Sequence, residues 1–235
     1  MVYAGTSGWA YTSWKPGFYP SKLGAANFLN YYATRLNSVE VNHTFTTFPS
    51  EEVLRRWMEA TPTDFKFAIK AHYTITHAKR LRKVAKATKE FLASIRPLRN
   101  VNKLGPVLFQ LPPNFKCDPR VLRAFLAGLA GRGRAAMEFR HVSWFNDEVY
   151  EALRQANVAL CLAESEKIET PDVSTADFSY FRLRKEKYSP KARKALAERV
   201  ARLGERGDVF VYFKHGETPE GAKYARSLLK KIKLF

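Results

Sequence analysis

Seven polar side chains stand at or near the ends of short β-rich runs and could share one pocket. They are Glu40, Lys70, Gln110, Glu138, Arg140, Arg182 and Lys214. Two carboxylates among four cations in a poorly solvated pocket should show strongly shifted pKa values. Such a pocket suits an anionic substrate, with one carboxylate serving as a base or a metal ligand. The alternative is a self-neutralising ion-pair lattice, but buried pairs stabilise proteins weakly, which favours a function.

The histidines could move protons near neutral pH. All five follow the end of a predicted strand, and none is predicted on a helix: His43, His72, His77, His141 and His215. We expect Glu138 or Glu40 to act as the base and His77 or His141 as the proton donor. No HExxH pair or aspartate cluster accompanies them. No metal ligand is therefore assigned, and the cofactor stays open, with a divalent metal as one candidate.

Several groups could hold the substrate. Lys70, Arg140 and Arg182 would bind an anion and offset negative charge that develops in the reaction. Gln110 lies on the same predicted inner face as these residues, and so does Asn42 beside Glu40. These are the neutral candidates in the pocket.

Two loops have features that suit phosphate. The first is 5–9, in which glycines permit close approach, Thr6 and Ser7 offer hydroxyls, and Trp9 could stack on a ring. A plain tight turn with Trp9 in packing is the alternative. The second loop, 214–218, leads into the last predicted helix, although Glu217 adds a negative charge there.

Short β-rich runs bounded by turn residues predict the strands that would position these groups. The predicted strands are 2–6, 37–42, 65–70, 105–110, 134–140, 157–163, 178–182 and 208–214. Apolar residues at three- and four-residue spacing predict helices over 84–98, 121–129 and 196–203. A capping residue followed by proline marks helix starts at Asp118-Pro119, Ser189-Pro190 and Thr218-Pro219.

Strand and helix alternating about eight times in 235 residues predict a single (β/α)₈ TIM barrel of one domain, 1–235. An open doubly wound sheet is the alternative. The link 164–177 contains Pro171 and no apolar period, so the helix after strand six is expected to be missing.

Alternation along each strand predicts which side chains face inward. Val39 and Val41 should lie under the helices, whereas Glu40 should face the barrel interior. The same reasoning places Lys70, Gln110, Glu138 and Arg140 on inner faces, with Arg182 beside Tyr180 and Lys214 beside Tyr212. Barrel enzymes place their chemistry at the carboxyl ends of the strands, where these side chains would meet.

Composition limits the class of protein. Hydrophobic residues make up 46% and charged residues 26%, which excludes disorder, collagen and coiled coil. No apolar run reaches a membrane-spanning length, and the start lacks a signal-peptide pattern. With only two cysteines, we expect a reduced, cytoplasmic protein that is not bound to a membrane.

The charge of +18 attracts polyanions, with nucleic acid, nucleotides and anionic lipid as candidate partners. Residues 79–103 hold nine basic side chains and one acidic one. Such stripes are typical of nucleic-acid-binding faces, although a general solubility charge explains them equally well. The oligomeric state stays open.

A set of motifs resembles the YecE-like family, also called DUF72, a TIM-barrel domain of unknown function. The opening motif is Gly5-Thr6-Ser7-Gly8-Trp9, followed by Phe18-Tyr19-Pro20. Further motifs are Val39-Glu40-Val41-Asn42, Ile75-Thr76-His77, Gln110-Leu111-Pro112-Pro113, Glu138-Phe139-Arg140-His141 and Tyr180-Phe181-Arg182. Together they cover nearly the whole chain.

The resemblance implies a TIM barrel with a pocket around nine positions, and it supplies no reaction. Those positions are Glu40, Asn42, Lys70, His77, Gln110, Glu138, Arg140, His141 and Arg182. The barrel is similar in kind to the sugar-isomerase and apurinic-endonuclease group, an analogy of fold only. The chain departs from the family after strand eight, where Lys214-His215-Gly216-Glu217 replaces an asparagine-rich stretch.

Three functions fit these observations. The first is a hydrolase or lyase acting on a phosphorylated or nucleic-acid substrate in the polar pocket. The second is a non-catalytic, basic nucleic-acid-binding protein, and the third is an enzyme for a small metabolite such as a sugar phosphate. The first two differ in whether pocket residues or helix charges such as Arg82 and Lys83 decide binding.

Overall fold

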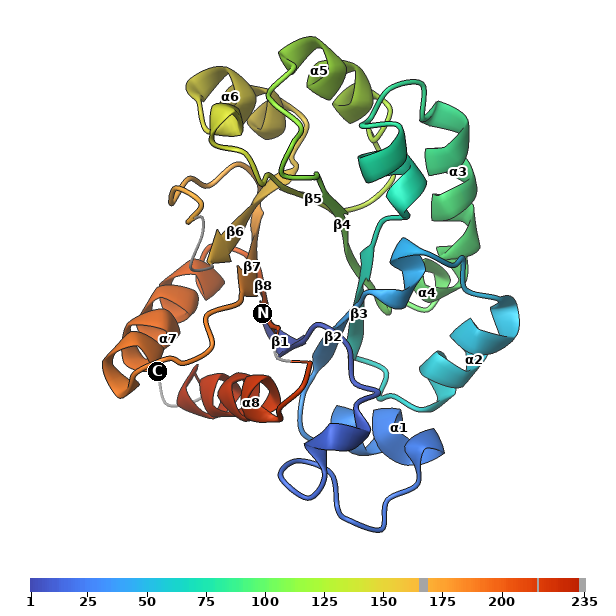
Figure 1. Cartoon of the computed structure of the whole chain (residues 1–235), viewed down its shortest axis with the longest axis vertical. Coiled ribbons are helices and arrows are strands. Elements are labelled where there is room, and N and C mark those ends of the chain that lie inside the picture. Colours follow the sequence, from blue (N-terminus) through green and yellow to red (C-terminus); the bar gives the residue numbers. More distant parts are fainter. Residues whose placement is uncertain (165–168, 215, 233–235) are drawn as a thin grey trace.

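The computed structural model describes residues 1–164, 169–214 and 216–232, which form a ring of eight parallel strands surrounded by helices (Figure 1). The strands are β1 (Val2–Thr6), β2 (Ser38–Val41), β3 (Lys66–Lys70), β4 (Leu104–Gln110), β5 (Ala135–Glu138), β6 (Ala159–Glu164), β7 (Phe178–Leu183) and β8 (Asp208–Phe213). Their order is β1-β8-β7-β6-β5-β4-β3-β2. The predicted barrel is confirmed, and the open doubly wound sheet is excluded.

The seam between β1 and β2 is closed differently from the other seven pairs. Those pairs form parallel ladders, with one register shift between β3 and β4, whereas β1 and β2 share a single bridge between Ser7 and Glu40. The N–H of Gly8 donates to the carbonyl of Glu40 at 2.8 Å. The seam therefore brings the loop after β1 directly onto Glu40.

Side chains replace the missing ladder along the rest of this seam. The Asn37 amide exchanges two hydrogen bonds with the backbone of β1, at 2.9 and 2.8 Å. The buried hydroxyl of Tyr32 accepts from the N–H of Thr6 at 2.8 Å and donates to the carbonyl of Ser38 at 3.0 Å. A Cβ on Gly5 would lie 1.8 Å from that carbonyl, so the close approach requires glycine.

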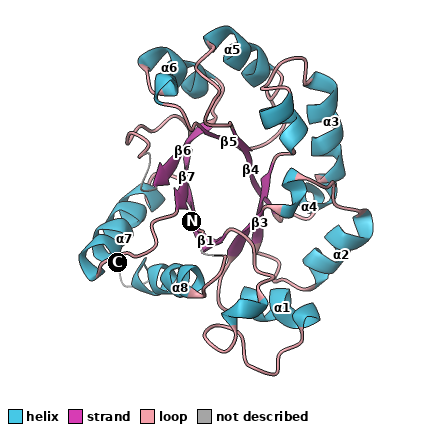
Figure 2. Cartoon of the chain, in the orientation of Figure 1, coloured by secondary structure: helices cyan, strands magenta, loops and turns pink. Residues whose placement is uncertain are grey.

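Eight helices surround the strands in the described residues (Figure 2). They are α1 (Phe28–Ala33), α2 (Glu51–Glu59), α3 (Ala85–Ser94), α4 (Arg96–Asn100), α5 (Pro119–Ala127), α6 (Asp147–Gln155), α7 (Pro190–Gly204) and α8 (Glu220–Ile232). No helix lies between β6 and β7 in the described part of that link, 169–177, as predicted. Residues 165–168 of the link lie outside the description.

Most predicted helix boundaries agree with the structure. Asp118 and Ser189 cap α5 and α7 by accepting from the N–H three residues later, and proline follows each at the first helical position. The predicted helix start at Pro219 was wrong by one residue, because α8 begins at Glu220. The single helix predicted over 84–98 is two helices, α3 and α4, divided at Ile95 before Pro97, which cannot continue a helix.

The barrel interior confirms the predicted strand faces. One buried cluster fills it, with small side chains on β3, β5 and β6 opposite large rings on β1, β7 and β8: Tyr3, Ala68, Leu108, Ala136, Ala159, Cys161, Ala163, Phe178, Tyr180, Phe210 and Tyr212. Val39, Val41, Phe67 and Phe109 belong to the separate core under the helices. The inner faces therefore carry an apolar floor with polar groups above it. Among the described residues, no helix is both long and apolar enough to cross a membrane.

Removing the hydroxyl of Tyr32 should weaken the β1–β2 seam. In Tyr32→Phe the N–H of Thr6 loses a buried acceptor, and we expect the free energy of unfolding to fall by about 1–3 kcal/mol in urea titrations. Tyr31→Phe is the matched control, since the Tyr31 hydroxyl makes no hydrogen bond to any described residue. Equal stability of the two variants would show that the seam does not depend on this hydroxyl.

Candidate functional site

A buried guanidinium joins two buried carboxylates from opposite parts of the barrel. Arg182 on β7 donates to Glu40 on β2 through Nη2 at 2.7 Å and through Nε at 3.1 Å. Its Nη1 donates to Glu138 on β5 at 2.5 Å. All three side chains are 2% exposed or less, and they lie more than 40 residues apart in sequence. The predicted convergence of charges from distant strands is present in the structure.

The carboxylate of Glu40 has a full set of donors. Besides Arg182, it accepts from the hydroxyl of Ser7 at 2.7 Å and from that of Tyr180 at 2.7 Å. Burial raises the pKa of Glu40, but the Arg182 charge and these hydrogen bonds outweigh burial and leave the pKa below its usual value. Glu40 is therefore ionised and already bonded at neutral pH.

Glu138 is held in the same way by a larger set. Gln110 donates to it at 2.8 Å, Arg184 at 2.6 Å and Arg140 at 3.2 Å, in addition to Arg182. Burial raises its pKa, while the charges of Arg182, Arg184 and Arg140 lower the pKa far more. A carboxylate bonded to three arginines is a weak base, which argues against the base role predicted for Glu138 and, by the same reasoning, for Glu40.

Lys70 is a cation of the site that has no counterion among the described residues. Its Nζ lies 3.9 Å from the ring centroid of Phe45 and makes no hydrogen bond or ion pair to the rest of the described chain. Burial and the Arg182 charge lower the pKa of Lys70, the two carboxylates raise it, and the result is about 8. At neutral pH this amine can both give and take a proton.

The described histidines lie in the loops that follow β2, β3 and β5. His77 packs its ring edgewise on Phe45 and bonds through Nδ1 to the Thr76 hydroxyl at 2.9 Å. Burial and the Lys70 charge lower its pKa, so the imidazole is neutral at pH 7. His141 bonds through Nδ1 to Ser143 at 2.8 Å.

The prediction that no histidine lies on a helix was wrong for two of the five. His43 begins a 3₁₀ turn, and His77 lies in a π-helical turn, Thr74–Ala78. Both turns follow directly on the strand ends, where the backbone must reverse toward the outer helices. His215 lies outside the described residues.

In the loop at 5–9, the donors that were expected to bind an anion are already hydrogen-bonded within the protein. The hydroxyl of Thr6 donates to the carbonyl of Gly8 at 2.7 Å and contacts Tyr32 on the outer side of the sheet. The N–H groups of Ser7 and Gly8 are bonded to the backbones of β8 and β2. Trp9 packs edgewise on Trp57. Thr6 and Trp9 are therefore outside the cluster, and Ser7 enters it as a donor to Glu40.

Other predicted residues lie at the edges of the cluster. Asn42 is half-buried at the end of β2, and its side chain forms no hydrogen bond within the described residues. Lys214 is exposed just beyond β8 and is close enough to Arg184, Arg182 and Arg140 to feel their charges. The predicted phosphate-binding loop, 214–218, includes His215, which lies outside the described residues, so its phosphate role stays a prediction.

Arg184 and Phe45 are site residues that the sequence analysis missed. Arg184 follows Arg182 by two residues, so extending strand seven by one alternation would have found it. Its Nε–H is buried without an acceptor among the described residues. Phe45 lies in a 3₁₀ turn after β2, where strand parity carries no information.

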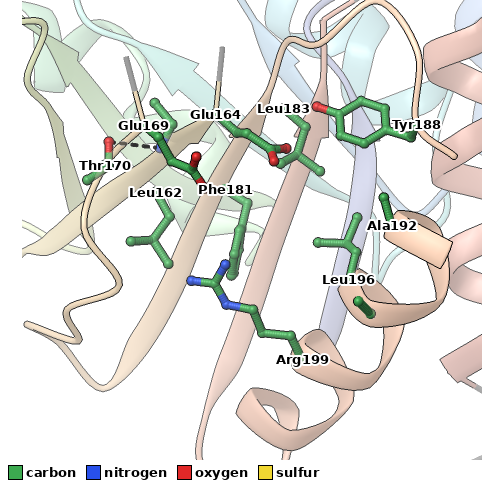
Figure 3. Close-up of a pocket in the computed structure, with 12 residues that line it drawn as sticks. Leu162, Glu164, Glu169, Thr170, Phe181, Leu183, Tyr188, Ala192, Leu196 and Arg199 are labelled. Carbon is green, nitrogen blue, oxygen red and sulfur yellow. Dashed lines mark hydrogen bonds between the residues drawn. The ribbon is translucent and has the colours of Figure 1, made fainter. Parts of the chain in front are cut away.

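Four cavities in the described residues have linings that exclude Glu40, Glu138 and Arg182, and the widest of the four, of about 1030 Å³, lies beside Met1, Asn37 and Arg226. One of about 260 Å³ separates α7 from β6 and β7, on the side of the ring that lacks a helix (Figure 3). Apolar side chains line much of it, and Arg199 extends from α7 toward Phe181. In the part of the chain that the structure describes, no three histidine, cysteine or acidic side chains converge to hold a metal ion.

Comparison with known proteins places the chain in a family. Residues 3–234 match the family model described as "Protein of unknown function DUF72". The chain belongs to the DUF72 family. A DUF72 family protein from Thermotoga maritima superposes with a TM-score of 0.88 at 29% identity, covering 99% of both chains. The resemblance read from the motifs is therefore confirmed.

The chain matches about half of the length of two curated relatives. UPF0759 protein YecE from Escherichia coli is 36% identical over 148 residues, which are 62% of this chain and 50% of that protein. UPF0759 protein YunF from Bacillus subtilis is 31% identical over 64% of this chain and 55% of its own length. An AP endonuclease, family 2, from Brucella melitensis shares the fold alone, with a TM-score of 0.56 at 11% identity.

Removing the central cation should strongly destabilise the barrel. In Arg182→Met two buried carboxylates lose their shared partner, and we expect the free energy of unfolding to fall by about 3–5 kcal/mol. The double variant E40Q/R182M removes one negative and one positive charge and leaves Glu138 paired with Arg140 and Arg184, so it should recover part of that loss in the same urea titrations. A double variant less stable than Arg182→Met would contradict the account, because charge imbalance would then not be the cause.

Proposed function

We propose that this DUF72 protein binds an anionic, phosphate-bearing ligand at the carboxyl ends of β3, β5 and β7 and acts on it as a hydrolase or lyase. Five cations surround two carboxylates there, which leaves an excess of three positive charges when both lysines are protonated. The cations are Arg140, Arg182, Arg184, Lys70 and Lys214. Because the oxygens of both carboxylates already accept hydrogen bonds from their neighbours, the excess positive charge is left to attract an anionic ligand.

The observation that carries the proposal is a set of donors left uncommitted around a saturated pair of carboxylates. Arg184 has a buried Nε–H without an acceptor, Arg140 uses only its Nε in the network, and Lys70 has no ion pair among the described residues. Guanidinium groups match the geometry of phosphate oxygens, and in a poorly solvated site they stabilise developing negative charge strongly.

The protonation states assign roles within such a reaction. Lys70, with a pKa of about 8, is the acid–base group, in place of the carboxylates. His77 is neutral at pH 7 and so accepts protons rather than supplies them. His141 stands at the end of β5 as a second proton carrier, held by Ser143. Glu40 and Glu138 position Arg182, Arg184 and Arg140 against the ligand.

A small-metabolite enzyme would use the same contacts, and the comparisons favour neither a polymer nor a small substrate. The likeness to the Brucella AP endonuclease is compatible with chemistry at a phosphate, but at 11% identity it supports the fold alone.

Sulfate binding tests the anion site, because the charge of sulfate is constant over the relevant pH range. In calorimetric titrations from pH 6 to 10, affinity should begin to fall as the pH rises through about 8, where Lys70 loses its proton. Lys70→Met should remove this pH dependence and weaken binding at pH 7, and Arg140→Gln should weaken binding about 10-fold or more.

Lys89→Met, on the exposed side of α3, is the matched control and should bind sulfate like the unaltered protein. The same variants can be assayed with chromogenic phosphate mono- and diesters, for which Lys70→Met should lose turnover while keeping its fold. If Lys70→Met and Arg140→Gln both bound sulfate as tightly as the unaltered protein, the proposed site would be refuted.

A further inference from the structure

The rim of the barrel carries a strongly basic hollow, whose lining shares no residue with the central cluster. A cavity of about 540 Å³ is lined by four cationic side chains from the loops after β3 and β4 and from the start of α5: Arg80, Arg82, Lys116 and Arg120. The acidic side chain in its lining, Asp118, caps α5 and is already paired with Arg82 at 2.8 Å. The hollow therefore has an excess of positive charge that nothing in the cluster neutralises.

The backbone that presents these arginines is held in an unfavourable conformation. Arg80, Leu81 and Lys83 have φ angles of 45°, 64° and 50°, which L-residues rarely adopt. The segment follows directly on a π-helical turn, Thr74–Ala78, and Leu81 anchors it by complete burial in the core. Strain of this kind persists where it places side chains for a purpose. Here it holds Arg80 and Arg82 beside Phe115, within 5.8 and 5.3 Å of its ring centroid.

Hydrogen bonds connect the basic hollow to the central cluster. The hydroxyl of Ser143 accepts from the N–H of Cys117, in the wall of the hollow, at 2.8 Å. The same hydroxyl bonds to Nδ1 of His141 at the end of β5. The hollow and the carboxyl end of β5, which carries Glu138, are thus linked through Ser143 and His141.

On the other side of Lys70, aromatic rings are open to solvent. Phe48 and Tyr73 are 41% and 43% exposed, and both contact the ring of His72, at 5.0 and 4.8 Å between centroids. Tyr73 also contacts Phe45, the ring beneath the Lys70 ammonium, at 6.2 Å. Exposed rings next to a basic track are the arrangement by which proteins bind single-stranded nucleic acid.

We infer that the ligand of this face is a single-stranded nucleic acid, with its backbone along the basic hollow and unpaired bases on Phe48 and Tyr73. The inference rests on the proposed function, since one phosphate would lie at Lys70 and Arg140. A duplex fits less well, because its bases are stacked internally and cannot reach the rings. An isolated phosphometabolite would leave the hollow and the strained segment without a use.

Fluorescence anisotropy with a labelled 12-nucleotide single strand tests the inference. The rim variant R80Q/K116Q/R120Q leaves the Arg82–Asp118 pair and the α5 cap in place. It should weaken binding about 10-fold or more and reduce the slope of log K against log salt by about 2. Tyr73→Ala and Phe48→Ala should each weaken binding about 5-fold or more. The control R202Q/R206Q/K230Q removes three exposed charges from the ends of α7 and α8 and should change neither affinity nor slope by as much.

The outcomes separate this inference from the proposed function. If the rim variant and the control variant bind the labelled oligonucleotide with equal affinity, the inference is overturned. Sulfate binding at Lys70 would still support the anion site. If the rim variant weakens oligonucleotide binding but the Lys70 and Arg140 variants bind sulfate with unchanged affinity, the proposed function is wrong and the nucleic-acid surface is supported. Equal or tighter binding of the matching duplex, or equal competition by polyglutamate, would show that the ligand class is wrong.

Discussion

The guanidinium of Arg182 lies between two carboxylates inside the barrel, and the chemistry of the whole face depends on this bridge. Glu40 and Glu138 cannot be buried as charges without it, because an unpaired carboxylate in an apolar interior is very costly. Once paired, Glu138 in turn holds Arg140 and Arg184 in place. Both carboxylates are therefore already paired, and the cations in excess of them decide which ligands this face can bind.

The barrel supplies this arrangement through its closure and its filling. Tyr32 and Asn37 replace a backbone ladder at the β1–β2 seam, which sets Ser7 against Glu40. Below the network, small side chains on one side and aromatic rings on the other fill the interior and exclude water. Burial of the Lys70 amine above this floor is the main reason that its pKa lies so far below the ordinary value, and the Arg182 charge lowers the pKa further.

The repeated strand–helix pattern was sufficient to predict the barrel, and alternation within the strands predicted most of the charged cluster. Glu40, Glu138 and Arg182 each lie on the face that period-two alternation assigns, and Arg184 continues the same alternation by one step. What alternation could not predict was the contact made by each group. Thr6 turns to Tyr32, and Phe45 enters through a 3₁₀ turn, because both depend on long-range packing that no local pattern records. The number of donors on each carboxylate decides between base and positioning group, and that number needs coordinates.

Membership of DUF72 supplies the fold and supplies no reaction, so the electrostatics of the site has to be measured on this chain. The most direct measurement is the pKa of the Lys70 amine, by carbon-13 NMR of protein labelled at the lysine ε-carbon, assigned with Lys70→Met. The account predicts a value of about 8, produced by burial and by the Arg182 charge. A value at the ordinary 10.5 would contradict it, because burial and the Arg182 charge would then not act on the Lys70 amine, which could not exchange its proton near neutral pH.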